Sequence, residues 1–208
     1  MGVGRIGAVV LAGGRSSRMG DAHKLLLPLG GRPVAAYALD AALGSGADPV
    51  VVVLGHRADD VRAALPAEGY QVVVNAEYAA GMSTSLRAGI AALPIDVAGA
   101  VMLLADQPLI TGEIVARVIA EARASGRGIV TASFGGGRGT PVYFARALFA
   151  ELLAVTGDEG GRAVIARHPA EVAVVELADD AAALDVDDPE QYTRLRALWD
   201  GYAKGSAG

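Results

Sequence analysis

The stretch that follows the first apolar run combines glycines with positive charge. Leu11–Gly20 reads LAGGRSSRMG, directly behind the apolar run Ile6–Val10, and Lys24 follows it. Glycine lets a main chain approach a ligand closely and take positive φ, so that consecutive N–H groups can line an anion-binding concavity. Because the chain has a formal net charge of -5, the cations Arg15, Arg18 and Lys24 at one strand end predict a polyphosphate ligand. The alternative is an ordinary glycine-rich turn with surface cations.

Two common nucleotide-binding templates do not fit this stretch. Gly2-Val3-Gly4-Arg5-Ile6-Gly7 matches the letters of the dinucleotide fingerprint, but it precedes the first strand, and that fingerprint needs its glycines in the turn after the strand. The phosphate loop of nucleoside triphosphatases requires Gly-Lys-Ser/Thr, which follows neither Gly13 nor Gly14. The sequence therefore predicts a phosphate loop of another kind.

Acidic residues that could hold a hard cation stand at two later places. Triphosphate chemistry needs such a cation, and Mg²⁺ is usually held by one or two carboxylates together with substrate oxygens and water. Asp106 follows the apolar run Ala100–Ala105, and alternation sends Asp185 and Asp187 to the same side of an extended segment. Capping or loop structure is the alternative for all three. Asp188 is the expected N-cap of the last helix.

Strands and helices that alternate along the chain must position these residues. Short β-branched runs predict strands, at Ile6–Leu11, Val50–Leu54, Val72–Val74, Ala100–Leu104, Ile129–Ala132 and Val172–Leu177. Helical patterns lie between them, at Pro33–Leu43, Ala58–Leu65, Ser83–Leu93, Glu113–Ser125, Arg146–Val155, Arg162–Arg167 and Pro189–Tyr202. This alternation predicts a three-layer α/β domain with a mostly parallel sheet, whose ligands bind at the carboxyl ends of the strands.

The later half departs from strict alternation. A glycine-rich turn, Phe134–Thr140, is expected to join the strands Ile129–Ser133 and Pro141–Phe144 as an antiparallel addition to the sheet. No interdomain linker is recognisable, so residues 1–203 are expected to form one domain and 204–208 a loose tail.

Composition excludes several classes of function. The chain has 208 residues, 52% of them hydrophobic, and no cysteine, which excludes disulfides, thiolate metal sites and a cysteine nucleophile. Because its net charge is negative, no net electrostatic attraction to nucleic acid or to an anionic membrane is expected. Every apolar run is shorter than the ~20 residues of a membrane span. We therefore expect a cytoplasmic protein without nucleic-acid or membrane partners.

The glycine-rich loop with Lys24 resembles the signature of the MobA-like nucleotidyltransferases, which include the guanylyl- and cytidylyltransferases of molybdenum cofactor maturation. Asp106-Gln107-Pro108 resembles the metal-binding turn of the same family. The resemblance implies a Rossmann-like nucleotidyltransferase fold and Mg²⁺ as cofactor. It implies a nucleotide pocket formed by Leu11, Ala12, Gly13, Gly14, Arg15 and Ser16. It also implies catalytic roles for Lys24, Arg18 and Asp106, with Mg²⁺ on Asp106, Asp185 and Asp187.

Two further segments extend the resemblance. Asn75–Leu86 resembles the family's Asn-x(5)-Gly-x-x-x-Ser pattern, which implies nucleotide contacts from Asn75, Ser83 and Ser85; Ser83 is also a natural N-cap for the helix it begins. Segments around Pro141 and Arg162 resemble the acceptor side of the cytidylyltransferase branch, which implies acceptor contacts from Gly139, Pro141, Gly157, Asp158, Gly160 and Arg162. Structural loops are the alternative. Thr140 stands where that branch has histidine, which puts the acceptor contact at this position in doubt.

The implied reaction transfers NMP from an NTP to the phosphate of molybdopterin and releases pyrophosphate, with a client molybdoenzyme as a further partner. CTP is favoured because Asp106–Pro108 and Gly157–Arg162 resemble the cytidylyl branch, whereas Gly13 resembles the guanylyl branch. Other possibilities stay open: GTP as donor to the same acceptor, a sugar-phosphate or isoprenoid acceptor, or a noncatalytic nucleotide-binding cofactor chaperone.

Overall fold

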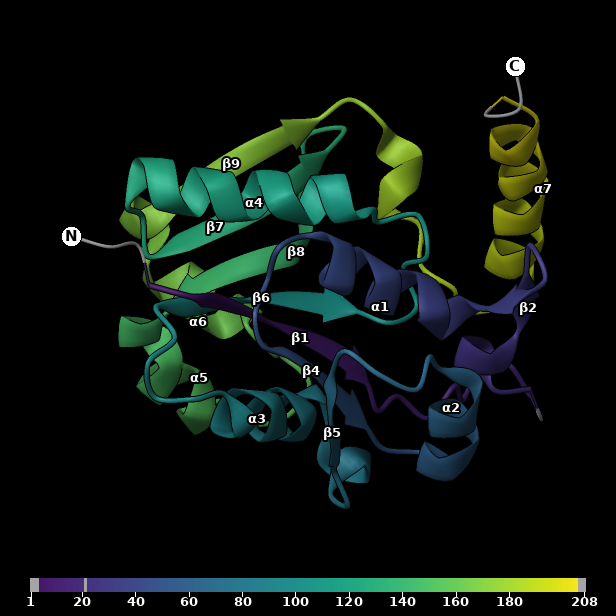
Figure 1. The fold of residues 1–208 in the computed structure, drawn as a ribbon, viewed down its shortest axis with the longest axis horizontal. Coiled ribbons are helices and arrows are strands. Elements are labelled where there is room, and N and C mark those ends of the chain that lie inside the picture. The colour runs from purple at the N-terminus through teal and green to yellow at the C-terminus, as the bar shows by residue number, and fades with distance from the viewer. Residues whose placement is uncertain (1–3, 21, 206–208) are drawn as a thin grey trace.

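A seven-stranded sheet with helices on both faces forms the centre of the molecule (Figure 1). The computed structural model describes residues 4–20 and 22–205, with side chains as far as Trp199. The strands lie in the order β5 (Gln71–Val74), β4 (Val50–Leu54), β1 (Ile6–Ala12), β6 (Gly99–Leu104), β8 (Gly137–Ala145), β7 (Ile129–Phe134) and β9 (Val172–Leu177). Within the described residues, β8 is the only strand of this sheet that runs antiparallel to its neighbours. The predicted three-layer, mostly parallel fold with an antiparallel addition is confirmed.

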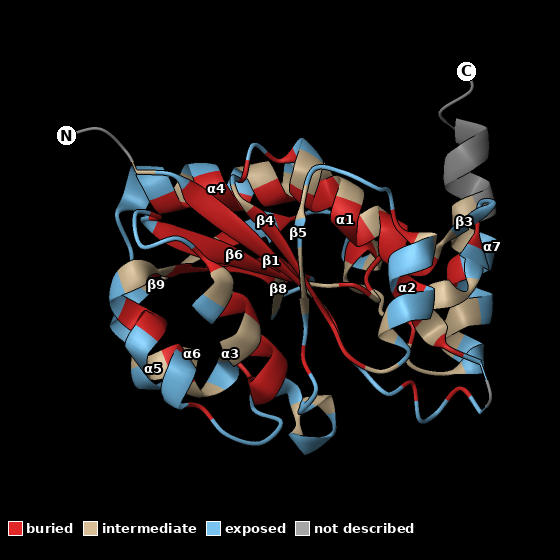
Figure 2. Cartoon of the chain, turned by 60° about the horizontal axis from the view of Figure 1, so that its bottom comes forward, coloured by how far each residue is buried: buried red, intermediate tan, exposed pale blue. Residues whose placement is uncertain are grey.

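Both faces of the central strands are buried, which explains their continuous apolar runs. Helices α1 (Val34–Gly44) and α4 (Gly112–Ser125) cover one face, and α3 (Met82–Ala92), α5 (Phe149–Ala154) and α6 (Arg162–Arg167) cover the other (Figure 1). In β1, Ala8 and Val10 pack on the α1 side, whereas Val9 packs on the α3 side. Figure 2 shows the resulting buried centre beneath helices with exposed outer faces.

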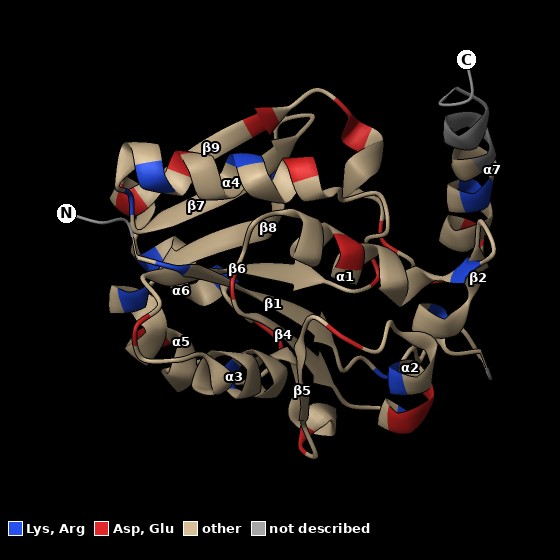
Figure 3. Cartoon of the chain, viewed as in Figure 1, with Lys and Arg blue, Asp and Glu red and all other residues tan. Residues whose placement is uncertain are grey.

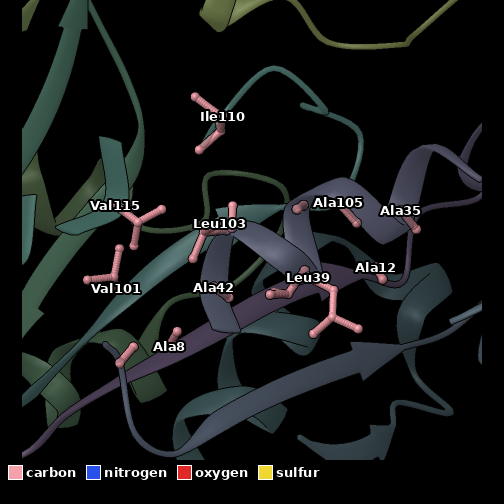
Figure 4. Packing of buried hydrophobic residues seen from close by; sticks show 14 of the residues in the cluster. Ala8, Ala12, Ala35, Leu39, Ala42, Val101, Leu103, Ala105, Ile110 and Val115 are labelled. Carbon is pink, nitrogen blue, oxygen red and sulfur yellow. The ribbon is translucent and has the colours of Figure 1, made fainter. Parts of the chain in front are cut away.

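Small residues let α1 approach the sheet closely. Ala35, Leu39 and Ala42 of α1 lie over Ala8 and Ala12 of β1 in the same core cluster (Figure 4). Charged side chains lie mainly on the outer helices and loops, while the central strands carry few (Figure 3). No helix of the described residues is both long and apolar enough to cross a membrane.

Three peripheral elements complete the chain. The hairpin β2 (Pro28–Leu29) and β3 (Arg32–Pro33) lies next to the last helix, α7 (Pro189–Gly205). Helix α2 (Ala58–Ala64) follows β4. The N-cap prediction for α7 is confirmed, because the Asp188 carboxylate accepts a hydrogen bond from Gln191 N at 2.8 Å.

Some predicted boundaries differ from the structure. Ser83 was expected to cap α3, but the helix begins at Met82 with Gly81 as N-cap, so Ser83 lies inside the first turn. The helix expected at Arg146–Val155 begins as a separate 3₁₀ turn, Arg146–Leu148. Helix α7 continues through 204–205, where a tail was expected; residues 206–208, and Gly2 and Val3 of the rejected fingerprint, lie outside the described residues.

The parallel strands β1, β4, β5 and β6 all end at one edge of the sheet (Figure 1). Because β8 is antiparallel to β6, its first residues lie at that edge too. Segments 13–20, 22–24, 75–81, 105–107, 137–140 and 178–187 therefore meet there, which brings predicted site segments from both halves of the chain to one edge.

Candidate active site

The glycine-rich loop leaves β1 after Ala12 and closes on itself before Lys24. Lys24 N donates to Ser16 Oγ at 3.2 Å, and Met19 N donates to Ser16 O at 3.0 Å. Of the glycines in this stretch, Gly20 has the positive φ that the sequence allows (62°), whereas Gly13 and Gly14 do not; the other left-handed residue is Ser16 (53°). The left-handed residues thus lie where the loop turns back, while Gly14 and Arg15 are exposed at its tip.

Gly13 is required by close packing with two neighbouring elements. A Cβ at this position would lie 2.8 Å from Ser85 Oγ and 3.7 Å from Gly55 Cα. His56 N also donates to Gly13 O, at 3.4 Å. The glycine therefore has a packing reason that is independent of the nucleobase, and it does not by itself favour guanine.

Lys24 lies between two of the predicted metal-binding carboxylates. Its Nζ donates to Asp106 Oδ2 in a very short contact and to Asp187 Oδ1 at 2.7 Å. The Lys24 side chain is only 12% exposed. Burial lowers the pKa of Lys24, but the charges and hydrogen bonds of Asp106 and Asp187 outweigh that effect, so its pKa lies above the usual value. Lys24 is consequently a fixed cation at neutral pH.

Arg18 reaches the same acidic pair from the solvent side. Its guanidinium donates to Asp187 Oδ2 at 2.9 Å, and its side chain is 72% exposed. The hydrogen bond from Lys24, assisted by Arg18, holds the pKa of Asp187 below its usual value. Asp187 therefore stays ionised and accepts from both predicted phosphate-binding cations.

The segment 185–187 is held against the end of β6. Val186 N donates to Asp106 O at 3.0 Å, and the Val186 side chain is fully buried in the core. Asp185 and Asp187 on either side face the site, as the alternation predicts. Burial first, then the charges of Asp187 and Asp106, raise the pKa of Asp185. Asp106 and Asp187 thus lie close enough to Asp185 to disfavour its charged form.

The donor set fits a divalent cation shared with a nucleotide. Asp106 Oδ1 is buried and has no hydrogen-bond partner among the described residues, so one carboxylate oxygen in the site is unsatisfied. No compact cluster of three or more His, Asp or Glu ligands occurs in the part of the chain that the structure describes. One or two carboxylates completed by phosphate oxygens and water are the arrangement that Mg²⁺ prefers.

Two of the predicted nucleotide residues, Asn75 after β5 and Ser85 on α3, share a buried hydrogen-bond network with Thr84. Asn75 Nδ2 donates to Thr84 Oγ1 at 2.8 Å and to Ser85 Oγ at 3.0 Å, while Asn75 Oδ1 accepts from Glu77 N at 2.9 Å. Both amide hydrogens are therefore used to hold β5 against α3. Ser83 Oγ is buried and has no partner within the described chain.

A cavity of about 650 Å³ opens next to the carboxylates. Four of the six predicted acceptor residues line it: Gly139, Asp158, Gly160 and Arg162. Leu11, predicted for the nucleotide, lines it as well, together with Asp185. Its walls include Met102, Phe144 and Ile165, and Arg138 adds a second cation that the sequence analysis missed.

Pro141 and Gly157 do not line this cavity. Pro141 is buried within β8. Gly157 O accepts from Ser83 N at 3.0 Å, and Asp158 Oδ1 accepts from Met82 N at 3.1 Å. The acceptor-side segment therefore also caps α3, whose N-terminus lacks a side-chain cap of its own.

Two groups near the site were not predicted. Gln107 and Thr140 are joined by a very short hydrogen bond from Thr140 Oγ1 to Gln107 Oε1. His23 and His56 stack with ring centroids 5.6 Å apart, and both ring nitrogens of His23 are buried without a partner among the described residues. The two residues of each pair are far apart in sequence, so no local sequence pattern indicates that they are in contact.

The sequence matches the model of the MobA-like NTP transferase domain over residues 8–172. The chain is similar to the nicotine blue oxidoreductase of Paenarthrobacter nicotinovorans, at 33% identity over 90% of this chain and 94% of that protein. It is also similar to the purine catabolism protein PucB of Bacillus subtilis, at 34% identity over 90% and 94% of the two chains. These names state different roles.

The crystal structure of Rv0371c from Mycobacterium tuberculosis superposes with a TM-score of 0.83 at 35% identity, over 94% of this chain and 100% of that one. A second crystal structure of that protein is described as a complex with manganese, with a TM-score of 0.78 over 93% and 98% of the chains. The fold, the loop leading to Lys24 and the family match agree. The chain belongs to the MobA-like NTP transferase family and is a nucleotidyltransferase of that family.

Proposed function

We propose that this protein is a Mg²⁺-dependent cytidylyltransferase that transfers CMP from CTP to the phosphate of a molybdopterin-type acceptor. An acceptor phosphate oxygen forms a bond to the α-phosphorus. The bond from the α-phosphorus to the bridging oxygen breaks, and pyrophosphate leaves with that electron pair. No covalent enzyme intermediate is needed.

The observation that carries the proposal is Lys24 between Asp106 and Asp187, next to the cavity. A phosphate-binding cation, two carboxylates and an acceptor-sized space meet where three segments far apart in sequence converge. Transfer to a phosphate needs positioning and charge stabilisation more than covalent chemistry by the protein. This arrangement provides both.

Lys24 stabilises the charge that develops on the leaving pyrophosphate. Its raised pKa keeps the ammonium charged, and its low exposure makes that charge more effective than a solvated one. Arg18 is suited to a mobile role. Because an exposed ion pair is worth only about 0–1 kcal/mol, Arg18 can exchange Asp187 for a phosphate at little cost.

Asp106 and Asp187, with Asp185 beside them, would hold the metal ion. When bound, Mg²⁺ neutralises phosphate oxygens and orients the α-phosphate. The unsatisfied Asp106 Oδ1 supports this role. The manganese complex of the related Rv0371c supports it too, because Mn²⁺ and Mg²⁺ favour the same oxygen ligands.

The cavity supports a ring-containing acceptor with an anionic group. Met102, Phe144 and Ile165 offer apolar surface for a ring system, and the two arginines of the wall offer charge for a phosphate. Molybdopterin is proposed on the resemblance of 139–141 and 157–162 to the cytidylyl branch. With Gly13 explained by packing against Ser85, the remaining segments favour CTP over GTP.

The test is pyrophosphate release measured with each of the four NTPs, with molybdopterin or a panel of sugar phosphates, and with Mg²⁺ or EDTA. We expect release with CTP, molybdopterin and Mg²⁺ together. Pyrophosphate release from GTP but not from CTP would show that GTP is the donor. Pyrophosphate release only with a sugar phosphate would show that the acceptor is a sugar phosphate and not molybdopterin. Nucleotide binding without any release would favour a noncatalytic chaperone.

The Lys24→Ala variant, measured in the same pyrophosphate-release assay, tests the role of Lys24. Loss of one preorganised charge at the reacting group is expected to lower kcat about 10²- to 10³-fold. Arg123→Ala, which removes an exposed cation from α4, should keep wild-type turnover. Equal activity of Lys24→Ala and the wild type would refute the role of Lys24.

A further inference from the structure

The side chain of Gln107 connects three segments of the site. It is buried, at 8% exposure. Its Oε1 accepts from Thr140 Oγ1 of β8, and its Nε2 donates to Ala183 O, at 3.4 Å, in the segment that leads to Asp185. The amide orientation follows from Ala183, because a carbonyl can only accept and therefore faces the amide nitrogen, which leaves Gln107 Oε1 to accept from the Thr140 hydroxyl.

Gln107 also belongs to the turn that presents Asp106. Gln107 N donates to Leu104 O at 3.3 Å, and Ile110 N donates to Gln107 O at 3.3 Å. Asp106 O accepts from Val186 N in the same turn. The first two main-chain bonds shape the turn, Val186 ties it to the segment after β9, and the Gln107 side chain ties it to β8.

Thr140 supplies the only hydroxyl that bonds to Gln107 among the described residues, and both side chains line the cavity. Its loss would leave Gln107 Oε1 without that donor, and movement of the turn toward another donor would relieve the loss. That movement would displace the adjacent Asp106. The Thr140 hydroxyl hydrogen is thus used inside the protein, so toward a ligand in the cavity this hydroxyl can only accept.

We infer that Gln107 and Thr140 are a positioning pair that sets the orientation of Asp106 for divalent-cation binding, from the wall of the acceptor cavity. The inference rests on the proposed metal role of Asp106. It goes beyond that role because it assigns the orientation of a metal ligand to a hydrogen bond with β8.

Thr140→Val is the direct test, since it removes the hydroxyl and keeps the shape. Mn²⁺ is titrated into the protein alone and, in a second series, with CTP present, and the free ion is followed by electron paramagnetic resonance. Substitutions of groups that orient metal ligands typically weaken metal binding 10- to 100-fold. We expect Thr140→Val to raise the Kd for Mn²⁺ about 10-fold, Gln107→Met to have a similar effect, and Thr140→Ser to restore binding.

Thr131→Val is the matched control, because Thr131 lies in the same cavity wall and its Oγ1 is buried without a partner in the described structure. It should leave the Kd for Mn²⁺ unchanged. A Thr140→Val protein that binds Mn²⁺ within twofold of wild type in both series overturns the inference, as does failure of Thr140→Ser to restore binding. Absence of Mn²⁺ binding by the wild type would overturn the metal site as well.

These outcomes are separate from those of the transfer assay. Mn²⁺ binding is measured without an acceptor, so it does not depend on which group receives the nucleotide. If no NTP is turned over but Thr140→Val still weakens Mn²⁺ binding, the proposed function fails and the positioning pair stands. Thermal unfolding of each variant shows whether a lost affinity comes from a misfolded protein.

Discussion

At the scale of single residues, the positive and negative side chains of the site form ion pairs with one another. Lys24 and Arg18 were predicted as phosphate ligands and Asp106 and Asp187 as metal ligands, and the structure pairs the two sets. A bound nucleotide with its metal ion would bring both phosphate charge and cation charge, so each set could exchange its present partner for a ligand of the same sign. The paired state keeps the site folded without stranding a buried charge.

His23 gives the protein a pH-dependent stability. Burial first, and then the charges of His56 and Arg57, lower the pKa of His23 below the 6.5 of a free histidine. The unfolded chain therefore binds a proton at a higher pH than the folded chain does. Stability from this residue is complete above pH 6.5 and is lost as the pH falls from 6.5 toward the folded pKa.

Urea unfolding at pH 7.5 and 5.5 tests this effect. We expect the free energy of unfolding to fall below pH 6.5, with a slope from His23 of at most about 1.4 kcal/mol per pH unit. His23→Phe should lose that part of the slope. His168→Gln, at a histidine whose ring bonds to Glu151 on the surface, should keep it. The same slope in His23→Phe as in wild type would contradict the assignment.

At the scale of elements, α3 packs closely against the sheet and carries two of the residues predicted to bind the nucleotide. Its N-terminus is capped by 157–158, its first turn bonds to Asn75, and Gly89 lies directly on β1. A Cβ on Gly89 would lie 2.3 Å from Val9 Cγ1 and 3.1 Å from Val53 Cγ2. The helix therefore approaches the strands as closely as backbone allows.

Gly89→Ala should be destabilising although alanine favours helices. The gain in helix propensity is about 1 kcal/mol, and overpacking costs about 1–3 kcal/mol; because the nearest atom is only 2.3 Å away, the cost should lie at the upper end, for a net loss of up to about 2 kcal/mol. Gly44→Ala at the end of α1 is the control, because its Cβ would meet no atom within 4 Å. It should be neutral or stabilising by up to about 1 kcal/mol. Thermal unfolding of both variants measures the difference, and a stabilised Gly89→Ala would show that α3 can move away from β1.

At the scale of the whole molecule, one ligand would join both halves of the sheet. The loop after β1, the turn after β6 and the segment after β9 all contact Lys24 or its partners. A nucleotide with its metal bound there would therefore stabilise the entire fold by mass action.

Thermal unfolding with CTP and Mg²⁺ measures that coupling. At a ligand concentration 100 times the Kd, we expect about 2.7 kcal/mol of stabilisation, which raises the Tm of a chain this size by about 5–10 °C. EDTA or Asp106→Asn should remove most of the rise. Asp96→Asn should keep it, because this exposed aspartate pairs with Arg5 before the first residues of β1 and β6, at the edge of the sheet opposite the site. A full shift in EDTA would contradict a metal-dependent nucleotide site.

The sequence by itself determined the layers, the order of elements and the site segments. Strands buried on both faces must be apolar throughout, so β1, β4 and β6 were recognisable from local pattern alone. The family loop identified Lys24, and alternation placed Asp185 and Asp187 on one side of their segment. Each of these features depends on residues close together in the chain.

Only the tertiary structure decided which polar groups satisfy one another. The N-terminus of α3 is capped by Asp158 instead of Ser83, and the Thr140 hydroxyl is bound to Gln107. The cation Lys24 lies against carboxylates from two other segments. A buried polar group needs a hydrogen-bond partner, and any segment that the fold brings within reach can supply it. Which segments lie within reach depends on distances between parts of the chain that are far apart in sequence, and a local sequence pattern holds no information on those distances.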